Sequence, residues 1–279
     1  MINKNLIFDV GMHKGEDTKF YLAKGFNVVA FEANPELVEQ SKNRFKNEIE
    51  EKRLIIIEGA IIGKDFNKKV KFYKNKTNTV WGTVLKQWAE RNEKEGALSE
   101  PIEVNAVNFA ECLIKFGTPY YLKIDIEGMD VVCCESLLSV KEKPLYISIE
   151  SEKVDFNKLV MEFNLFERLG YKSFNIIQQD NIKRQKERNP SKENEFIDYN
   201  FSEGSSGLFG KDLPETWVNK QESLIKYKKI FFLYKLFGDR SFLKQNLFTK
   251  YILKILRKLT GIPLPGWYDT HAKHQENDE

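Results

Sequence analysis

The sequence predicts an α/β protein built on a mostly parallel, doubly wound β-sheet. Short apolar runs with β-branched or aromatic residues alternate with amphipathic, charge-rich stretches from residue 5 to residue 150. Two of these runs, residues 54–57 and 145–149, are almost wholly apolar, as expected for strands buried on both faces. The chain has 279 residues, of which 41% are hydrophobic and 30% charged, so it can bury a substantial core.

Strands and helices are expected to alternate along this first part of the chain. Pro35 fits a first helical turn, where its missing N–H would have no partner anyway. We expect strands at residues 6–10, 27–32, 54–58, 120–125 and 145–150, and helices at 16–24, 36–50, 109–116 and 131–139.

The alternation is interrupted between residues 68 and 107 and becomes weaker after residue 150. The interruption contains an expected hairpin strand (70–73), a segment with two tryptophans (80–88) and a short strand (102–107). Later residues predict a helix (156–169), a strand (173–177), a loop-like polar stretch (178–202) and a glycine-rich passage (204–210).

The positive charge is concentrated near the C-terminus. Residues 220–260 contain eleven Lys or Arg against Glu222 and Asp239, whereas the whole chain carries a net charge of only +3. We therefore divide the chain into a catalytic unit (1–218) and a basic helical extension with a tail (219–279). The extension fits either docking on an anionic membrane surface or packing on the body or a second subunit, and packing is favoured.

The cysteines and the N-terminus indicate a reducing compartment. Cys112, Cys133 and Cys134 are odd in number, and Cys133 and Cys134 fit buried apolar positions on a helix. No secretion signal precedes the first strand, and no apolar run reaches the length of a membrane-spanning helix. We expect a cytoplasmic protein, with attachment to the inner membrane surface as the alternative.

The chemistry is expected where the first two strands end, because ligands of doubly wound sheets bind at the carboxyl ends of the strands. Gly11 and Gly15 frame a turn after the first strand, and Glu32 ends the second, about 20 positions later. An acid there accepts hydrogen bonds from a ribose. The turn lacks the glycine spacing that cradles a pyrophosphate, so S-adenosylmethionine (SAM), a nucleoside cofactor without phosphates, fits best.

Three segments resemble the signature sequences of the FkbM family of SAM-dependent methyltransferases. They are DVGMHKGEDT (9–18), FEANP (31–35) and LKIDIEGMD (122–130). The resemblance implies a Rossmann-like, seven-stranded class I methyltransferase fold. It also implies O-methylation of a small-molecule or carbohydrate hydroxyl, as in the biosynthesis of surface polysaccharides or other glycans.

The resemblance also implies roles for individual residues. Asp9, Gly11 and Gly15 would hold the methionine moiety, and Glu32 the ribose. Asp125 would face the sulfonium or the acceptor. The complete expected cofactor set, without a metal, is Asp9, Gly11, His13, Gly15, Thr18, Glu32, Ala33, Ala60, Ile61 and Asp125, with Ala60 and Ile61 at the adenine.

Transfer to a hydroxyl requires a group that accepts its proton, and the candidates are Asp125, Glu127, Glu150 and His271. Asp125 and Glu127 would share one side of a strand and, with a histidine, bind a divalent metal. Alternatively, Asp125 orients the acceptor and Glu127 begins the next helix, which is the favoured interpretation. His271 lies in a less charged tail that is expected to fold back onto the body.

Competing interpretations remain open at this point. Trp81 and Trp88 fit a stacking wall for a sugar as well as a core position. A nucleic-acid methyltransferase and a non-catalytic SAM-binding or membrane-associated scaffold are the alternative functions. We expect no nucleic-acid partner, and self-association remains open.

Overall fold

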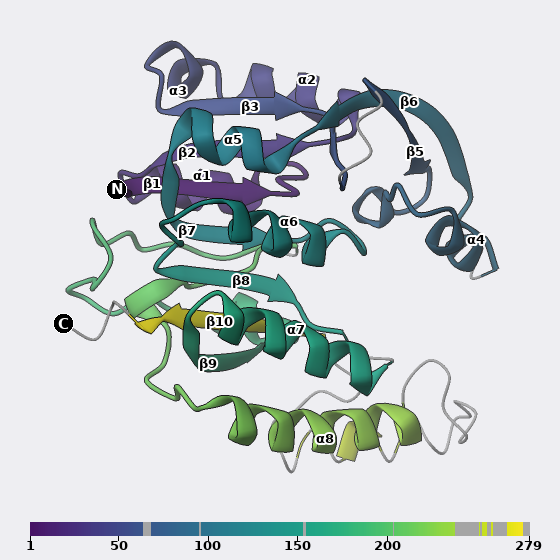
Figure 1. The fold of residues 1–279 in the computed structure, drawn as a ribbon, viewed down its shortest axis with the longest axis vertical. Helices are drawn as coiled ribbons and strands as arrows, with labels where there is room; N and C mark the ends of the chain where they lie inside the picture. The colour runs from purple at the N-terminus through teal and green to yellow at the C-terminus, as the bar shows by residue number, and fades with distance from the viewer. Residues whose placement is uncertain are drawn as a thin grey trace.

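The computed structural model describes residues 1–63, 68–94, 96–152, 155–202, 204–237, 251, 253–255, 258 and 267–275. Its centre is a seven-stranded sheet with the strand order β3-β2-β1-β7-β8-β10-β9 (Figure 1). All neighbouring strands pair in parallel except β10, which is antiparallel to both β8 and β9. The strands are β1 (Ile2–Val10), β2 (Asn27–Glu32), β3 (Leu54–Glu58), β7 (Thr118–Ile124), β8 (Tyr146–Glu150), β9 (Tyr171–Gln178) and β10 (Tyr268–His274).

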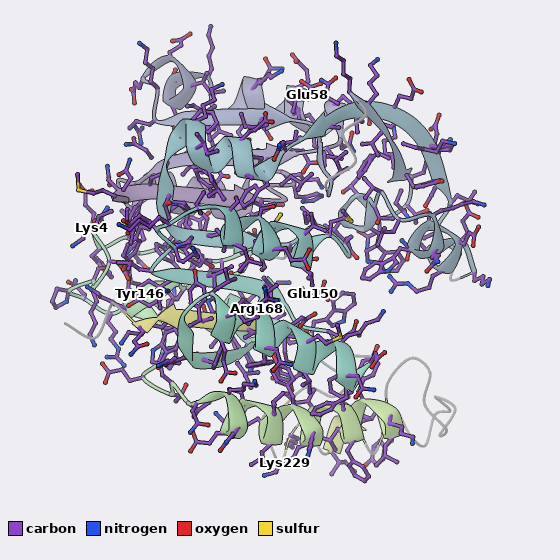
Figure 2. All side chains as sticks on the ribbon, in the orientation of Figure 1. Lys4, Glu58, Tyr146, Glu150, Arg168 and Lys229 are labelled. Carbon is purple, nitrogen blue, oxygen red and sulfur yellow. The ribbon has the colours of Figure 1, made fainter. Side chains whose placement is uncertain are left out.

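The expected strands are confirmed, and their burial explains their composition. All seven residues of β7 are buried, as are the last five of β1, because helices or loops cover both faces of the sheet. We call the edge at which the parallel strands end the carboxyl edge. Figure 2 shows Tyr146 and Glu150 at the two ends of β8, with Glu150 at this edge.

Helices cover one face of the sheet. The covering helices are α5 (Phe109–Phe116), α6 (Asp130–Ser136) with the short η2 (Leu137–Ser139), and α7 (Phe156–Arg168). Phe8, Leu122 and Ile147 point toward this face and belong to one buried cluster with Phe109, Cys133 and Phe163 from these helices. Cys133 and Cys134 are buried with free thiols, as expected.

Helix α1 (Glu16–Ala23) covers the opposite face, and its core includes Tyr21, Tyr121 and Phe209. The expected single helix 36–50 is two helices, α2 (Pro35–Arg44) and α3 (Lys46–Glu50), because Phe45 leaves helical geometry with φ −107° and ψ 32°. Asn34 begins α2 by accepting the Glu36 N–H at 3.1 Å, and Pro35 occupies the first helical position.

The interrupted region forms a second, smaller sheet beside the carboxyl edge. Its strand order is β4-β6-β5, formed by β4 (Ala60–Ile61), β5 (Lys69–Asn75) and β6 (Ser99–Val107). Between β5 and β6 lie a 3₁₀ turn, η1 (Thr79–Trp81), and α4 (Lys86–Lys94), a helix that the sequence did not predict.

The polar stretch after β9 is loop-like, as expected, apart from η3 (Gln179–Arg184), and it covers the α1 face of the sheet. Lys24 at the end of α1 is fully buried and holds this loop. Its ammonium pairs with Glu187 and with Asp212, at 3.1 Å in the latter case, and donates to Ser191 at 2.8 Å. Asp212 belongs to the short η4 (Gly210–Asp212). A buried ion-pair cluster therefore connects this stretch to the end of α1.

The basic extension begins with α8 (Lys220–Phe237), which packs against α7 and β9. Tyr227 is its anchor, because its buried hydroxyl bonds to Ser151 and to Thr270, the latter at 2.6 Å. The favoured packing on the body is thus confirmed for this helix. Within the described residues, no helix combines the length and apolarity needed to cross a bilayer.

The tail contributes a strand that the sequence did not predict. β10 lies between β8 and β9, with His271 opposite Ser148 and Asn175. The sequence-based division placed residues 219–279 outside the catalytic unit, whereas the pairing of β10 puts residues 268–274 inside its main sheet. The division was wrong for these residues because it followed chain order, whereas hydrogen bonding between strands decides which strands are neighbours in a sheet.

Candidate active site

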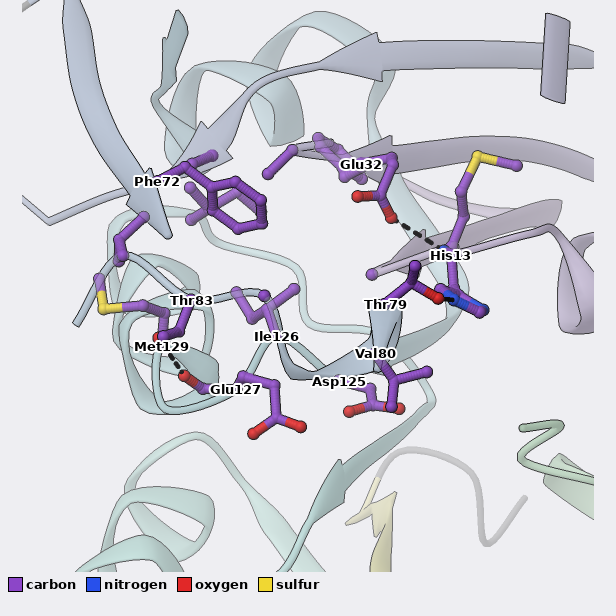
Figure 3. A pocket seen from close by; sticks show the side chains of 18 of the residues that line it. His13, Glu32, Phe72, Thr79, Val80, Thr83, Asp125, Ile126, Glu127 and Met129 are labelled. Carbon is purple, nitrogen blue, oxygen red and sulfur yellow. Dashed lines mark hydrogen bonds between the residues drawn. The ribbon is translucent and has the colours of Figure 1, made fainter. Parts of the chain in front are cut away.

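A cavity opens at the carboxyl edge, between the main sheet and the smaller sheet. It encloses about 840 Å³, including the part open to solvent. The ends of β1, β2 and β7 form its floor, and the segment from Phe72 to Val84 forms a wall (Figure 3). The expected site residues that border it are Gly11, His13, Glu32, Ala33, Ala60, Ile61, Asp125 and Glu127.

The turn after β1 requires glycine for two reasons. Gly11 has φ +83°, and a Cβ at this position would lie 1.9 Å from the backbone oxygen of Asp125. The N–H groups of Gly11 and Met12 both donate to the Phe31 oxygen at 3.0 Å. The turn therefore passes directly over the ends of β2 and β7, which leaves its backbone at the cavity.

Glu32 is the buried acid at the end of β2. Its carboxylate accepts the His13 N–H at 2.9 Å through Oε2 and the Asn34 N–H at 2.8 Å through Oε1. Each oxygen keeps a second lone pair, so two hydroxyls can still be accepted. Burial raises the pKa of Glu32, although the two N–H donors oppose that shift.

The smaller sheet reaches across the cavity and contacts the first turn. The His13 ring lies 2.7 Å from the Thr79 hydroxyl, and His13 itself has a left-handed backbone with φ 51°. Figure 3 shows this contact on one side of the cavity and Phe72 on another. Phe72 also packs directly against Gly82, where a Cβ would meet the Phe72 ring at 2.4 Å. The wall is thus tied to the floor by a hydrogen bond.

Lys123 is a buried charged residue at the cavity that sequence reasoning missed. Its ammonium donates to the Gly11 oxygen at 2.8 Å and lies 3.3 Å from Asp9 and 3.9 Å from Asp17 and Asp125. Burial lowers the pKa of Lys123, but the carboxylates of Asp9, Asp125 and Asp17 outweigh it and raise the pKa above its usual value. A lysine within an otherwise apolar strand, two positions before Asp125, was the available signal.

Asp17 shows how crowded this charge cluster is. Burial raises the pKa of Asp17 to about 7, against the opposing effects of Lys123 and of the Ser206 N–H, which donates to Asp17 at 2.8 Å. The contact also brings residues 204–206 to the cavity, where Gly204 forms part of the lining. Asp17 therefore links the floor to the loop that covers α1.

Asp125 and Glu127 follow β7 on the side of the cavity away from Glu32 (Figure 3). β7 ends at Ile124, and Glu127 has a left-handed backbone with φ 46°, so the two carboxylates do not share a strand face. Helix α6 begins only at Asp130, whose carboxylate accepts the Ile126 and Gly128 N–H groups at 3.2 Å. Glu127 therefore lies neither on the strand with Asp125 nor at the start of the helix, and both expectations were wrong. The reason is the turn between Ile124 and Asp130, which contains Glu127. Within the described residues, no group of three His, Cys, Asp or Glu side chains is arranged to hold a metal ion.

Several expected site residues lie outside the lining. Asp9 is fully buried beneath the turn, accepts the Thr18 hydroxyl at 2.6 Å and pairs with Lys123. Gly15, with φ +77°, packs against Phe45. These residues, with Thr18, support the turn rather than border the cavity. Glu150 ends β8 next to the lining and pairs in register with Asp269.

His271 lies within the sheet, away from the cavity lining. It is 2% exposed, and its ring stacks on Tyr121 with centroids 6.5 Å apart. Burial lowers the pKa of His271 to about 3, so the ring is neutral over the physiological range. The expected role as the base does not agree with this position. The structural reason is β10, whose pairing on both sides encloses the side chain.

Trp88 supports the cavity rather than presenting a face to a sugar. Gly128 packs so closely that a Cβ there would lie 3.1 Å from the Trp88 ring, and Arg91 covers this ring at 4.5 Å from the centroid. Trp88 therefore buttresses the turn that carries Glu127.

The topology and the site together define a class of protein. A sheet of this order, with an antiparallel final strand in an otherwise parallel array and with a glycine turn and an acid after the first two strands, is that of a class I SAM-dependent methyltransferase. The family model for the methyltransferase FkbM domain matches residues 9–173, more than half of the sequence, and the chain belongs to this family.

Solved structures similar to the chain include three methyltransferases. One is the methyltransferase FkbM from Methylobacillus flagellatus KT, with 14% identity, a TM-score of 0.40, and coverage of 64% of this chain and 40% of that one. A SAM-dependent methyltransferase from Geobacter sulfurreducens in complex with S-adenosyl-L-homocysteine has 10% identity, a TM-score of 0.37 and coverage of 99% and 86%. Precorrin-6y C5,15-methyltransferase from Geobacter metallireducens GS-15 has 12% identity, a TM-score of 0.34 and coverage of 64% and 71%. No curated protein matches the sequence.

The cavity fits SAM, the cofactor of this family. Gly11 lets the turn pack directly on the backbone of Asp125, and Glu32 retains acceptor capacity for ribose hydroxyls. Ala60 and Ile61 supply an apolar surface after β3, suited to an adenine ring. The lining is also rich in acids, which favours a sulfonium cation.

Proposed function

We propose that the protein transfers a methyl group from SAM to a hydroxyl of a small-molecule or carbohydrate acceptor, with glycan biosynthesis as the setting. The observation that carries this proposal is the position of Asp125. Its carboxylate borders the cavity after β7, and its side chain is 47% exposed, unlike the buried Asp9 and Asp17. It is thus open to an incoming hydroxyl.

In this proposal the chain mainly aligns the two reactants. Bound SAM supplies a methyl group activated by the sulfonium. Glu32 binds the ribose hydroxyls, and the turn at Gly11 holds the amino-acid end of the cofactor. Such alignment contributes roughly 7–11 kcal/mol to lowering a barrier.

Asp125 would accept the proton of the acceptor hydroxyl at a carboxylate oxygen. A positioned base of this kind contributes roughly 10²- to 10⁴-fold to the rate. Lys123 lies 3.9 Å from that carboxylate and orients it. Glu127 also borders the cavity and provides an acceptor for a further hydroxyl of a sugar.

The charge of the lining supports a small or uncharged acceptor over a nucleic acid. Among the described residues, Lys123 is the only Lys or Arg that lines the cavity, and it is already surrounded by carboxylates. A phosphate backbone would be repelled there, because nucleic-acid sites depend on Lys and Arg. The acids of the lining are Glu16, Asp17, Glu32, Asp125 and Glu127.

The test is label transfer from methyl-labelled SAM to a panel of sugars, nucleotide sugars, oligosaccharides and nucleic acids. Labelled methyl ether on a hydroxylated acceptor is the expected product. Asp125→Asn should lose transfer but keep SAM binding, and Asp198→Asn is the matched control, since its side chain is 82% exposed and lies away from the cavity. SAM binding without transfer to any acceptor would favour a scaffold, and label only on nucleic acid would replace the proposal.

A further inference from the structure

Helix α8 exposes a face that the packing on α7 and β9 does not use. One side of the helix is buried through Ser223 and Tyr227, and Leu224 and Phe231 pack on the core. At 100° per residue, the side away from these residues carries Ile225, Lys229, Phe232 and Lys235 within an arc of about 120°. We call these four residues the α8 outer face. Lys228 is not part of it, because its ammonium lies over the Phe156 ring of α7, 5.8 Å from the centroid.

This face combines exposed apolar side chains with positive charge. Ile225 is 55% exposed and Phe232 62%, and they lie seven residues apart, two turns along one line. The two lysines of the face, Lys229 and Lys235, are also exposed, and Figure 2 shows Lys229 on the outer side of the helix. The acid of α8, Glu222, lies one helical turn before this cluster.

The pattern continues beyond α8. Among the described residues of the extension after residue 250, Tyr251, Lys254, Ile255 and Lys258 are helical and exposed, with Tyr251 at 64% and Ile255 at 42%. Their spacing of three and four residues again places aromatic or aliphatic groups beside lysines on one side of a helix. Two separate helical stretches thus expose the same mixture.

We propose that the α8 outer face docks on the surface of an anionic lipid bilayer. Lysines beside an anionic surface contribute about 1 kcal/mol each, close to a fivefold gain in affinity, and apolar side chains between them enter the interface. The contact is peripheral. It rests on α8 and not on the proposed function.

Two other occupants fit the face less well. An identical face of a second copy would bring two lysines against two lysines, which like-charge repulsion opposes. A nucleic acid would engage the lysines but leave Ile225 and Phe232 exposed between phosphates. A bilayer satisfies both components.

Docking would also orient the active site. The hydroxyl of Tyr227 contacts Ser151, which directly follows β8, so this point of α8 lies at the carboxyl edge. The ten residues after Tyr227 extend about 15 Å further in the direction in which β8 ends (Figure 1). Docking through α8 would therefore fix the direction of the carboxyl edge relative to the bilayer.

The experiment is co-sedimentation of the full chain with vesicles of phosphatidylcholine alone or mixed with phosphatidylglycerol, at low and high salt. We expect binding only to the anionic vesicles, reduced by salt because screening shortens the reach of the lysines. Lys229→Glu with Lys235→Glu should lower the affinity at least about 25-fold. Ile225→Ser with Phe232→Ser should also weaken it, while retaining the charges.

The matched control is Lys46→Glu with Lys71→Glu, which makes the same charge change at exposed lysines of α3 and β5. Equal losses in the α8 and control pairs would overturn the proposal, as would absence of binding to anionic vesicles at low salt. Binding to nucleic acid but not to vesicles, or self-association abolished by the α8 variants without vesicle binding, would assign the face to another occupant. Thermal unfolding of each variant verifies that it is folded, and none of these readouts depends on methyl transfer.

Discussion

Replacement of Lys123 by methionine tests how much the buried ammonium contributes to the stability of the protein. The substitution keeps an unbranched side chain of similar length but removes the ammonium that lies 3.3 Å from Asp9 and 3.9 Å from Asp17. Both carboxylates are buried, with 0% and 3% of their surfaces exposed, so water cannot replace the lost charge. The donor to the Gly11 oxygen is lost as well.

The expected cost follows from these contacts. Removing one partner of a buried ion pair destabilises a protein by about 3–5 kcal/mol. That is a large share of a typical total stability of about 5–15 kcal/mol, so the variant should fold but unfold at a much lower denaturant concentration. SAM affinity should fall too, since the Gly11 turn loses its tether.

The cost should also depend on pH. The pKa of Asp17 is already raised to about 7 with Lys123 present, and it rises further without the ammonium. A raised folded-state pKa in a carboxyl group destabilises the fold as pH rises from the unfolded value of 3.8 toward the folded value, because ionisation then favours the unfolded chain. The variant should therefore be penalised most near pH 8 and least near pH 5.

Denaturant unfolding of wild type and variant at both pH values measures this effect. Lys42→Met is the control, since Lys42 and Glu58 form a pair at 3.2 Å with side chains 46% and 41% exposed, for which about 0–1 kcal/mol is expected. A loss below about 1 kcal/mol for Lys123→Met, or one that stays equal at both pH values, would refute the buried-charge argument.

Other substitutions test individual groups of the site. Glu32→Ala should weaken SAM binding by roughly 10- to 100-fold in calorimetry, and unchanged affinity would reject the ribose role. Asp125→Asn should lower kcat about 100-fold with little change in SAM affinity, and a fully active variant would dismiss the base. Gly11→Ala should abolish SAM binding, because the added Cβ would lie 1.9 Å from the Asp125 oxygen; a variant with normal binding contradicts the close approach. His271→Gln should leave the pH profile of kcat unchanged. Burial lowers the pKa of His271 in the folded protein from 6.5 to about 3, so the wild-type protein loses stability as pH falls from 6.5 toward 3. The His271→Gln variant should lose less stability over the same pH range. A changed pH profile of kcat in this variant would instead place His271 in the active site.

The sequence by itself determined the sheet strands up to β9 and the part of the site that lies next to them in the chain. Apolar runs such as residues 54–57 identify strands buried on both faces, and that property is local. Gly11, Glu32 and Asp125 could be assigned because each follows directly after such a strand, and parallel strands end at one edge. Eight of the expected site residues do border the cavity, whereas its wall from Phe72 to Val84 was not assigned to the cofactor or catalytic set.

The tertiary structure alone decided which polar groups meet and which are enclosed. Most residues of β10 are polar, so no local pattern indicated a central strand. The pairing of β10 with β8 and β9 buries His271, which removes this residue from the candidate bases. Lys123 acquired its role only when Asp9 and Asp17, more than a hundred residues away in the chain, were brought within 4 Å. Local propensity reports the burial of a segment, whereas charge pairing and strand insertion depend on contacts between distant segments, which only the folded chain creates.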